Sequence, residues 1–302
     1  MKFSILIANF NNGAFFKDCY RSIIDQTYNN WEVIIIDDCS TDNSVEKIKH
    51  LIGNDPRFQF YTNKKNQGCG YTKNRCVDLA NGIICGFLDS DDALKKDSLK
   101  LMVETHQKSP KIAIVTSKYI IANKDMEIVG ECSHGNEIPS GMSYLTYGKG
   151  AMTHFASFKK AAYNKTIGIN KNYKRAVDQD LYYKMEEQGN HVFINQYLYI
   201  YRNHSHNISL GQNKYKAHYW HFRAILDAYK RRKKLNSDID NFTSKAIKKY
   251  KSDYYLNRFE TFKNSKNYCS KFYFLYQSFI AAPFYRPFSI LKGLVYITLR
   301  KI

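Results

Sequence analysis

The stretch Ile83-Ile84-Cys85-Gly86-Phe87-Leu88-Asp89-Ser90-Asp91-Asp92 organises this chain of 302 residues. Its apolar first half predicts a buried β-strand, and three carboxylates follow directly. Unpaired carboxylates in a low-dielectric interior cost several kcal/mol each, so these must lie in a loop beyond the strand and face a positive partner. Ligands of open α/β sheets bind at that edge. Carboxylate oxygens suit Mg²⁺ or Mn²⁺, which commonly bridges substrate phosphates.

A helix N-terminus is the alternative explanation for these acids. Either Asp92 or Asp97 would suit the start of a helix through Leu99-Lys100-Leu101. An acidic side chain there accepts hydrogen bonds from free backbone N–H groups and complements the helix dipole. Capping accounts for one aspartate and leaves the others unexplained. The stretch by itself leaves both interpretations open.

The residues upstream alternate between predicted strands and helices. The expected strands are Phe3–Ala8, Trp31–Ile36 and Phe58–Tyr61, and the expected helices include Ser44–Ile52 and Tyr71–Ala80. Near-continuous apolar strands separated by helices indicate a parallel sheet covered on both faces. The second strand also ends in acids, Asp37 and Asp38, so two strand ends point at one crevice. The pattern therefore predicts an α/β nucleotide-binding architecture.

The second half of the chain continues less regularly. We expect strands at Ile112–Ser117, Tyr119–Ala122, Val192–Ile194 and Leu198–Tyr201, a polar and Gly-rich loop region at 123–150, and a helix from Lys174 to about Gln188. From Lys214 onward helical patterns dominate and the composition becomes basic and aromatic. We therefore predict a catalytic domain at 1–211 and a basic, aromatic-rich helical region at 212–302.

The charge of the chain is distributed unevenly. The net charge is +19, yet residues 1–211 hold 26 Lys and Arg against 22 Asp and Glu, and residues 212–302 hold 20 against 5. Such asymmetry suggests an anionic partner for the last third, either a membrane surface or a nucleic acid. Seven cysteines without a C-x-x-C pair fit reduced thiols in a cytoplasmic protein. We expect no signal peptide and no membrane-spanning segment.

Six motifs occur in a fixed order along residues 3–210. They are Phe10-Asn11; Ser22 with Gln26-Thr27-Tyr28; Asp37-Asp38-Cys39-Ser40-Thr41-Asp42; Asn66-Gln67-Gly68 with Lys73-Asn74; Phe87-Leu88-Asp89-Ser90-Asp91-Asp92; and Asp178-Gln179-Asp180-Leu181. This order closely resembles the family-2 glycosyltransferases, inverting enzymes that use nucleotide sugars. The resemblance implies the GT-A fold, a Rossmann-like, mixed and mostly parallel sheet flanked by helices. The basic helical C-terminal extension lies outside it.

The resemblance also implies roles for individual residues. The nucleotide sugar would contact Ala8, Asn9, Phe10, Asp37, Asp38, Lys73, Asp89, Ser90 and Arg202. Asp38 would accept a hydrogen bond from a uracil imide N–H. Asp91 and His204 would bind Mn²⁺ or Mg²⁺, although a solvated or core role for Arg202 and His204 stays open. Asp178 matches the general base, with Asp180 supporting its loop, and a role for Asp178 as an acidic helix N-terminus is the alternative.

Two positions depart from the family pattern. Lys73 stands where the family usually has Arg, which keeps the charge and loses the bidentate fork for phosphate. Val177 precedes Asp178 where the family usually has Glu, so one acid of that motif is absent. His154 is a further candidate for the acceptor side, although its setting in the sequence is equally compatible with packing.

The C-terminal region carries an apolar stripe at helical spacing. Its members are Phe284, Phe288, Leu291, Val295, Leu299 and Ile302, with Arg286, Lys292, Arg300 and Lys301 nearby. The stripe suits a helix lying in an anionic lipid interface, and equally one packed inside the protein or an oligomer. We expect a peripheral position on the cytoplasmic face of a membrane and no nucleic-acid partner.

The function predicted from these features is metal-dependent transfer of a sugar from a nucleotide donor, with UDP expected, to a hydroxyl of a cell-surface glycan or lipid-linked acceptor. A metal-dependent nucleotidyltransferase is the alternative within enzymes, because it also holds Mg²⁺ beside a phosphate. A non-catalytic basic protein that binds membranes or nucleic acids is the alternative outside enzymes.

Overall fold

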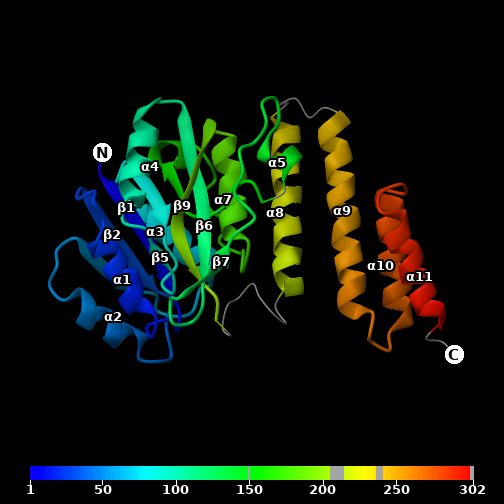
Figure 1. Cartoon of the computed structure of the whole chain (residues 1–302), viewed down its shortest axis with the longest axis horizontal. Coiled ribbons are helices and arrows are strands. Elements are labelled where there is room, and N and C mark those ends of the chain that lie inside the picture. The colour runs from blue at the N-terminus through cyan, green and yellow to red at the C-terminus, as the bar shows by residue number, and fades with distance from the viewer. Residues whose placement is uncertain (149, 205–213, 236–240, 300–302) are drawn as a thin grey trace. The chain divides into compact units, whose positions relative to one another are not determined.

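The computed structural model describes residues 1–148, 150–204, 214–235 and 241–299 (Figure 1). The chain forms two compact units, Met1–Asn207 and Ile208–Ile302. The predicted boundary between residues 211 and 212 lies outside the described residues.

The first unit is built on one mixed sheet of nine strands, and its N-terminal half is parallel. This half consists of β1 (Phe3–Asn9), β2 (Trp31–Asp37), β3 (Phe58–Thr62) and β4 (Ile84–Phe87), in the order β3-β2-β1-β4. The chain moves outward from β1 to β3 and then returns to place β4 on the other side of β1. This reversal creates a crevice at the carboxyl ends of β1 and β4, where ligands of such sheets bind.

The second half of the sheet contains both strand directions. Its strands are β5 (Ala93–Leu94), β6 (Ile112–Ala122), β7 (Ile128–Glu131), β8 (Ala156–Lys159) and β9 (Asn190–Arg202). β8 lies antiparallel between β4 and β6, and β9 runs parallel to β6. The β6–β9 pairing shifts register around Lys118. Each of the two strand pairs expected here is therefore one long, irregular strand.

Helices cover both faces of the sheet. They are α1 (Phe16–Ile24), α2 (Ser44–Ile52), α3 (Cys69–Leu79), α4 (Ser98–Gln107), α5 (Tyr144–Tyr147), α6 (Lys160–Tyr163) and α7 (Val177–Glu186). Alternate residues of β1, such as Ile5 and Ile7, share a buried core with α1, α2 and α4. α3 packs against β1 and β2, where the Cys76 thiol donates to the Ile7 carbonyl. The predicted mixed α/β fold is confirmed.

Two local expectations were wrong. Residues 123–150 contain β7 and α5 where the sequence predicts a loop region, because β7 pairs with the far end of β6. α7 begins at Val177, three residues later than expected. Ala176 has φ +52°, in the left-handed region, and a helix cannot run through that conformation.

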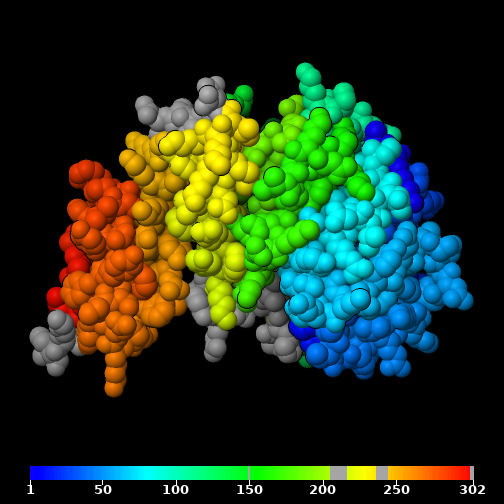
Figure 2. Space-filling model, turned by 180° about the vertical axis from the view of Figure 1, so that it is seen from behind, coloured from blue at the N-terminus to red at the C-terminus, as the bar shows by residue number. Residues whose placement is uncertain are grey.

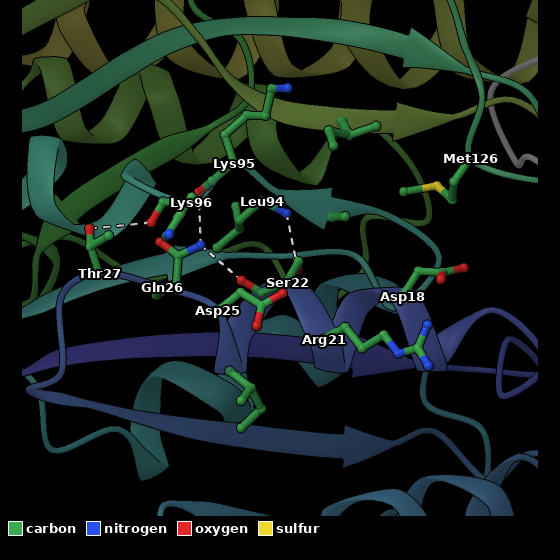
Figure 3. A pocket seen from close by; sticks show the side chains of 13 residues that line it. Asp18, Arg21, Ser22, Asp25, Gln26, Thr27, Leu94, Lys95, Lys96 and Met126 are labelled. Atoms are coloured by element: carbon green, nitrogen blue, oxygen red, sulfur yellow. Dashed lines mark hydrogen bonds between the residues drawn. The ribbon is translucent and has the colours of Figure 1, made fainter.

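Polar side chains from the end of α1 hold β5 in place (Figure 3). The Gln26 amide donates to the Ser22 and Lys95 carbonyls, and its oxygen accepts from the backbone N–H of Leu99. The Ser22 hydroxyl accepts from the Leu94 N–H. These contacts explain the Ser22 and Gln26 motif. It connects α1 to the segment after residues 89–92, which are called the acidic loop below.

The surface beside these contacts is hollowed into an open groove of about 740 Å³. Its lining includes Asp18, Arg21, Asp25, Lys95 and Lys96. None of the residues assigned above to the nucleotide, metal or base lies in this groove.

The second unit is helical throughout its described part. Its helices are α8 (Lys214–Lys234), α9 (Asn241–Phe262), α10 (Tyr268–Ala281) and α11 (Pro287–Leu299). A small core of Leu256, Phe259, Leu275, Ile290 and Ile297 joins the last three. Within the described residues, no helix is long and apolar enough to cross a membrane.

The connection through Gln26 predicts a stability effect. We expect Gln26→Leu to lower the free energy of unfolding by about 1–3 kcal/mol, because the Leu99 N–H and the Lys95 carbonyl lose a buried partner. Asp25→Asn, at an exposed neighbouring position, should change it by about 0.5 kcal/mol or less. Urea denaturation of both variants measures the difference, and equal midpoints would contradict this role.

Candidate active site

Asp37, at the end of β2, holds the loops after β1 and β2 together. Its carboxylate accepts from the Asn9 amide at 2.7 Å and from the Ser40 hydroxyl and backbone N–H at 2.6 and 2.8 Å. The side chain is fully buried, so Asp37 acts through the loops it fixes. The neighbouring Phe10 ring is 44% exposed at the crevice end of β1 and is free to meet a flat ligand face.

Asp38 fixes the loop before α3. Its carboxylate accepts from the Asn63 amide at 2.7 Å and from the backbone N–H groups of Gln67 and Gly68 at 2.8 Å. Gly68 has φ +87°, which other residues rarely adopt. A carboxylate has about four acceptor positions. One position therefore remains for the uracil N–H that the family resemblance assigns to Asp38.

Asp89, directly after β4, forms an ion pair with Lys73 of α3 at 2.8 Å. Burial disfavours the charged form of both groups, but the attraction between the two charges is larger. The pKa of Lys73 is raised by Asp89 despite burial, and the pKa of Asp89 is lowered by Lys73 and His154. Both groups are therefore charged near neutral pH. A ligand phosphate that approaches Lys73 meets an amine already paired with a carboxylate.

Asp92 joins the acidic loop to β9. Its carboxylate accepts from the Tyr199 hydroxyl and from the Arg202 N–H, each at 2.7 Å. The same hydroxyl accepts from the Asp89 N–H at 3.2 Å. Burial, together with Asp91 and Asp89, raises the pKa of Asp92 well above its usual range. Asp92 is thus an internal anchor, and Asp97 occupies the N-cap position of α4, although its side chain makes no capping bond there.

Arg202 supports the acidic loop from below. Its Nε donates to the Asp91 carbonyl, and its two terminal nitrogens donate to the Lys124 carbonyl and to the Asp18 carboxylate, at 2.6–2.7 Å. The side chain is 3% exposed. At least three of its five N–H donors therefore serve the protein, and contact of Arg202 with the diphosphate stays a prediction. Arg202 positions Asp91.

Asp91 and His204 are the residues that fit a divalent cation. The His204 Nε2 and one Asp91 oxygen lie 2.8 Å apart, so a carboxylate and an imidazole converge at one point. The adjacent Ser90 hydroxyl is buried without a hydrogen-bond partner. Among the described residues, no group of three or more His, Cys, Asp or Glu could hold a metal. Two protein ligands suit Mn²⁺ or Mg²⁺ when phosphate oxygens and water fill the other positions.

Asp178 stands in the first turn of α7 beside His154. The His154 Nε2 lies 3.7 Å from one Asp178 oxygen, and the Asp178 side chain is 31% exposed. The His154 ring stacks on Tyr199 with centroids 5.1 Å apart. Asp178 is therefore accessible to a substrate. Tyr199, which anchors Asp92, also supports His154.

Asp180 has a different environment from Asp178. It is buried, pairs with Lys184 at 2.6 Å and accepts from the Asn170 N–H at 3.0 Å. Lys184 in turn donates to the Gly168 carbonyl. These contacts hold the 168–170 loop, which agrees with the supporting role expected for Asp180.

The acidic strand ends and Asp178 converge near the first turn of α3. Burial raises the pKa of the Cys69 thiol to about 11, and the carboxylates of Asp89, Asp178 and Asp38 add to that rise. Lys73, His154 and Asp178 also line one small cavity of about 10 Å³. Segments far apart in the sequence thus place their charges around one point, as the topology predicts.

The sequence profile of glycosyl transferase family 2 matches residues 4–167. This chain belongs to that family. It is 31% identical over 234 residues to the chondroitin synthase of Escherichia coli, an alignment that covers 76% of this chain and 32% of that protein. The chain therefore spans about a third of the length of this relative.

Solved structures show the same fold. TarS 1–349 of S. aureus in complex with UDP-GlcNAc has a TM-score of 0.67 at 18% identity, over 94% of this chain and 82% of that one. A mannosyltransferase from Pyrobaculum calidifontis, in complex with GDP-Man and Mn²⁺, has a TM-score of 0.57 at 12% identity, over 99% and 86%. The family and the GT-A fold predicted for this family-2 chain are confirmed.

No sequence pattern singles out Tyr199, which the structure places at the centre of the site. This fully buried ring touches His154 and hydrogen-bonds both ends of the acidic loop. In the sequence it is one of three tyrosines and one phenylalanine in β9. Only the pairing of β9 with β5 and β6 brings it below the loop.

Removal of the Tyr199 hydroxyl tests this anchor. We expect Tyr199→Phe to lower the free energy of unfolding by about 1–3 kcal/mol, because the buried Asp92 carboxylate and the Asp89 N–H both lose a partner. Tyr201→Phe is the matched control, since no hydrogen bond is recorded for its hydroxyl in the described part of the chain. Chemical denaturation should separate the two variants; equal losses would argue against an anchoring role.

Proposed function

We propose that this chain is an inverting glycosyltransferase that moves a sugar from a nucleotide donor to an acceptor hydroxyl. The observation that carries the proposal is geometric: Asp38 and Asp89 follow strands that end at one edge of the sheet. Lys73, which pairs with Asp89, lines one small cavity together with Asp178. Asp38 offers a contact for the nucleobase, and Asp89 lies on the side expected for the diphosphate. Asp178 is a separate, partly exposed carboxylate. Family membership supports the reaction class.

UDP is the proposed nucleotide. The remaining acceptor position of Asp38 suits the imide N–H of uracil, and guanine offers a comparable N–H. The fold neighbour in complex with UDP-GlcNAc supports UDP, whereas the neighbour with GDP-Man has lower similarity. The identity of the sugar depends on side chains around 150–175, beside His154 and Asp178.

The chain's own residues would perform distinct parts of the reaction. Asp178 takes the proton from the acceptor hydroxyl as that oxygen attacks the anomeric carbon from the face opposite the leaving group. Lys73 meets the negative charge that develops on the departing diphosphate. Asp91 and His204 would hold Mn²⁺ or Mg²⁺ there. When bound, the cation would neutralise negative charge on the leaving diphosphate.

The proposed acceptor is a hydroxyl of a growing cell-surface glycan, free or lipid-linked. Support comes from the chondroitin synthase, whose name describes a polysaccharide product. The corresponding location is the cytoplasmic face of a membrane, with the chain bound peripherally. The strongly basic residues 212–302 support this location.

A donor screen tests the reaction class. The full chain is incubated with UDP- and GDP-sugars and Mn²⁺ or Mg²⁺, and nucleoside diphosphate release is measured. We expect slow hydrolysis of one UDP-sugar that stops when EDTA removes the cation. Pyrophosphate release from a nucleoside triphosphate would instead indicate a nucleotidyltransferase, and no turnover of any nucleotide sugar would count against the proposal.

Two aspartate variants separate cation binding from proton transfer. Asp91→Asn should abolish both turnover and metal-dependent UDP binding, because it removes a cation ligand. Asp178→Asn should abolish turnover and leave UDP binding within about twofold, because the base does not touch the nucleotide. Calorimetric titration with UDP and Mn²⁺ measures binding. Equal loss of UDP binding in both variants would contradict the assigned roles.

His154 is proposed to position Asp178. We expect His154→Gln to lower kcat roughly 10- to 100-fold, because a misplaced base loses its approach to the acceptor. The donor KM should change by less than about threefold, which a general loss of folding would not produce. His50→Gln, at an exposed position on α2, is the control. A normal kcat in the His154→Gln variant would contradict this role.

A further inference from the structure

Helix α11 presents one apolar side to solvent. Phe288, Leu291, Val295 and Leu299 are 54–78% exposed, and Phe284 in the preceding turn is 96% exposed. Their spacing of three or four residues places them on one side of the helix. The apolar stripe predicted from the sequence is therefore not covered by the other helices of its unit.

The opposite side of α11 is fixed by packing. Ile290 and Ile297 are buried in the small core with Leu275 of α10. Gly293 lies so close to Leu275 that an added Cβ would come within 2.8 Å of it. The helix is thus held in one rotational setting, and its exposed stripe is a defined feature of the unit.

Helix α10 adds a second exposed stripe. Its members are Phe272, Tyr273, Tyr276, Phe279 and Ile280, which are 40–61% exposed. α10 packs directly against α11, and Phe284 lies in the turn between them. Figure 2 shows these two helices in orange and red on the molecular surface. Soluble proteins seldom expose so many large apolar side chains without a partner.

The segment that carries these stripes is basic, and its only recorded acidic partners among the described residues are Asp253 and Glu260 of α9, which pair with Arg286 and Lys263. Residues 261–302 contain seven Lys and Arg and no Asp or Glu. Lys292 is exposed on α11 itself, and Lys266 is exposed just before α10. A second copy of the chain would bring the same positive charge against this face. Phosphate groups above a hydrocarbon layer match both its charge and its apolar side chains.

We propose that α10, α11 and the turn between them form a docking face for an anionic lipid bilayer. Phe284 and the α11 stripe enter the boundary between headgroups and acyl chains, and the lysines contact lipid phosphates. Tyr273 and Tyr276 suit the headgroup level, where one end of the ring is apolar and the hydroxyl is wet. This face does not depend on which reaction the first unit performs.

Vesicle flotation tests the face with the full chain. Vesicles of equal phosphatidylglycerol and phosphatidylcholine are compared with vesicles of phosphatidylcholine alone. We expect binding to the anionic vesicles only, weakened by salt, and a loss of about tenfold or more in Phe284→Ser/Phe288→Ser/Leu291→Ser. The matched control is Ile83→Ser/Ile128→Ser/Val129→Ser, which removes three exposed apolar side chains of the first unit.

The control should bind like the wild type, and both triple variants should keep the wild-type melting temperature and donor hydrolysis. Those two measurements separate failure of the docking face from failure of the proposed reaction. Equal flotation of the wild type and the Phe284 triple variant would overturn the proposal. The proposal would also be overturned if the wild-type chain did not bind anionic vesicles and instead formed a dimer that the Phe284 triple variant abolishes.

Discussion

The contact of the Tyr199 hydroxyl with Asp92 is the interaction on which the rest of the site depends. It joins the loop after β4 to the strand β9, which is more than a hundred residues later in the chain. Three carboxylates crowd that loop, and their mutual repulsion would open it without internal donors. Tyr199 and Arg202 supply those donors from beneath. Asp89 and Asp91 are then held apart from this internal anchor, beside Lys73 and His204 respectively.

The order of the strands explains why distant residues meet. β4 returns to the side of β1 opposite β2, so the loops after β1, β2 and β4 open at one edge. His154 lies just before the antiparallel β8, at the end of β8 that meets this edge, and α7 carries Asp178 beside it in its first turn. Asp89, Asp178 and His204 thus lie within two residues of the end of a regular element, and Lys73 lies in the second turn of α3. Rigid elements keep such a constellation precise.

Sequence patterns predicted the elements whose signals are local. Apolar runs marked β1, β2 and β4, and the acids after them marked the crevice, because charge cannot enter a strand buried on both faces. They could not predict which acids face outward. Asp92 differs from Asp91 only in its partners, and those partners lie on β9. The supporting role of Arg202 could not be predicted for the same reason, since its partners Asp91, Lys124 and Asp18 are distant in the sequence.

Because Lys73 is already paired with Asp89, the first unit offers an arriving diphosphate little uncompensated positive charge. Asp91 and Asp178 carry the same sign as that ligand. Under the proposed function, a nucleotide accompanied by a divalent cation would be favoured over a bare nucleotide, and the cation would be held more tightly once phosphate oxygens complete its shell. Such coupling is reciprocal by thermodynamic necessity. The two ligands of the proposed function would then be heterotropic effectors of each other, and the affinity of either would be defined only at a stated concentration of the other.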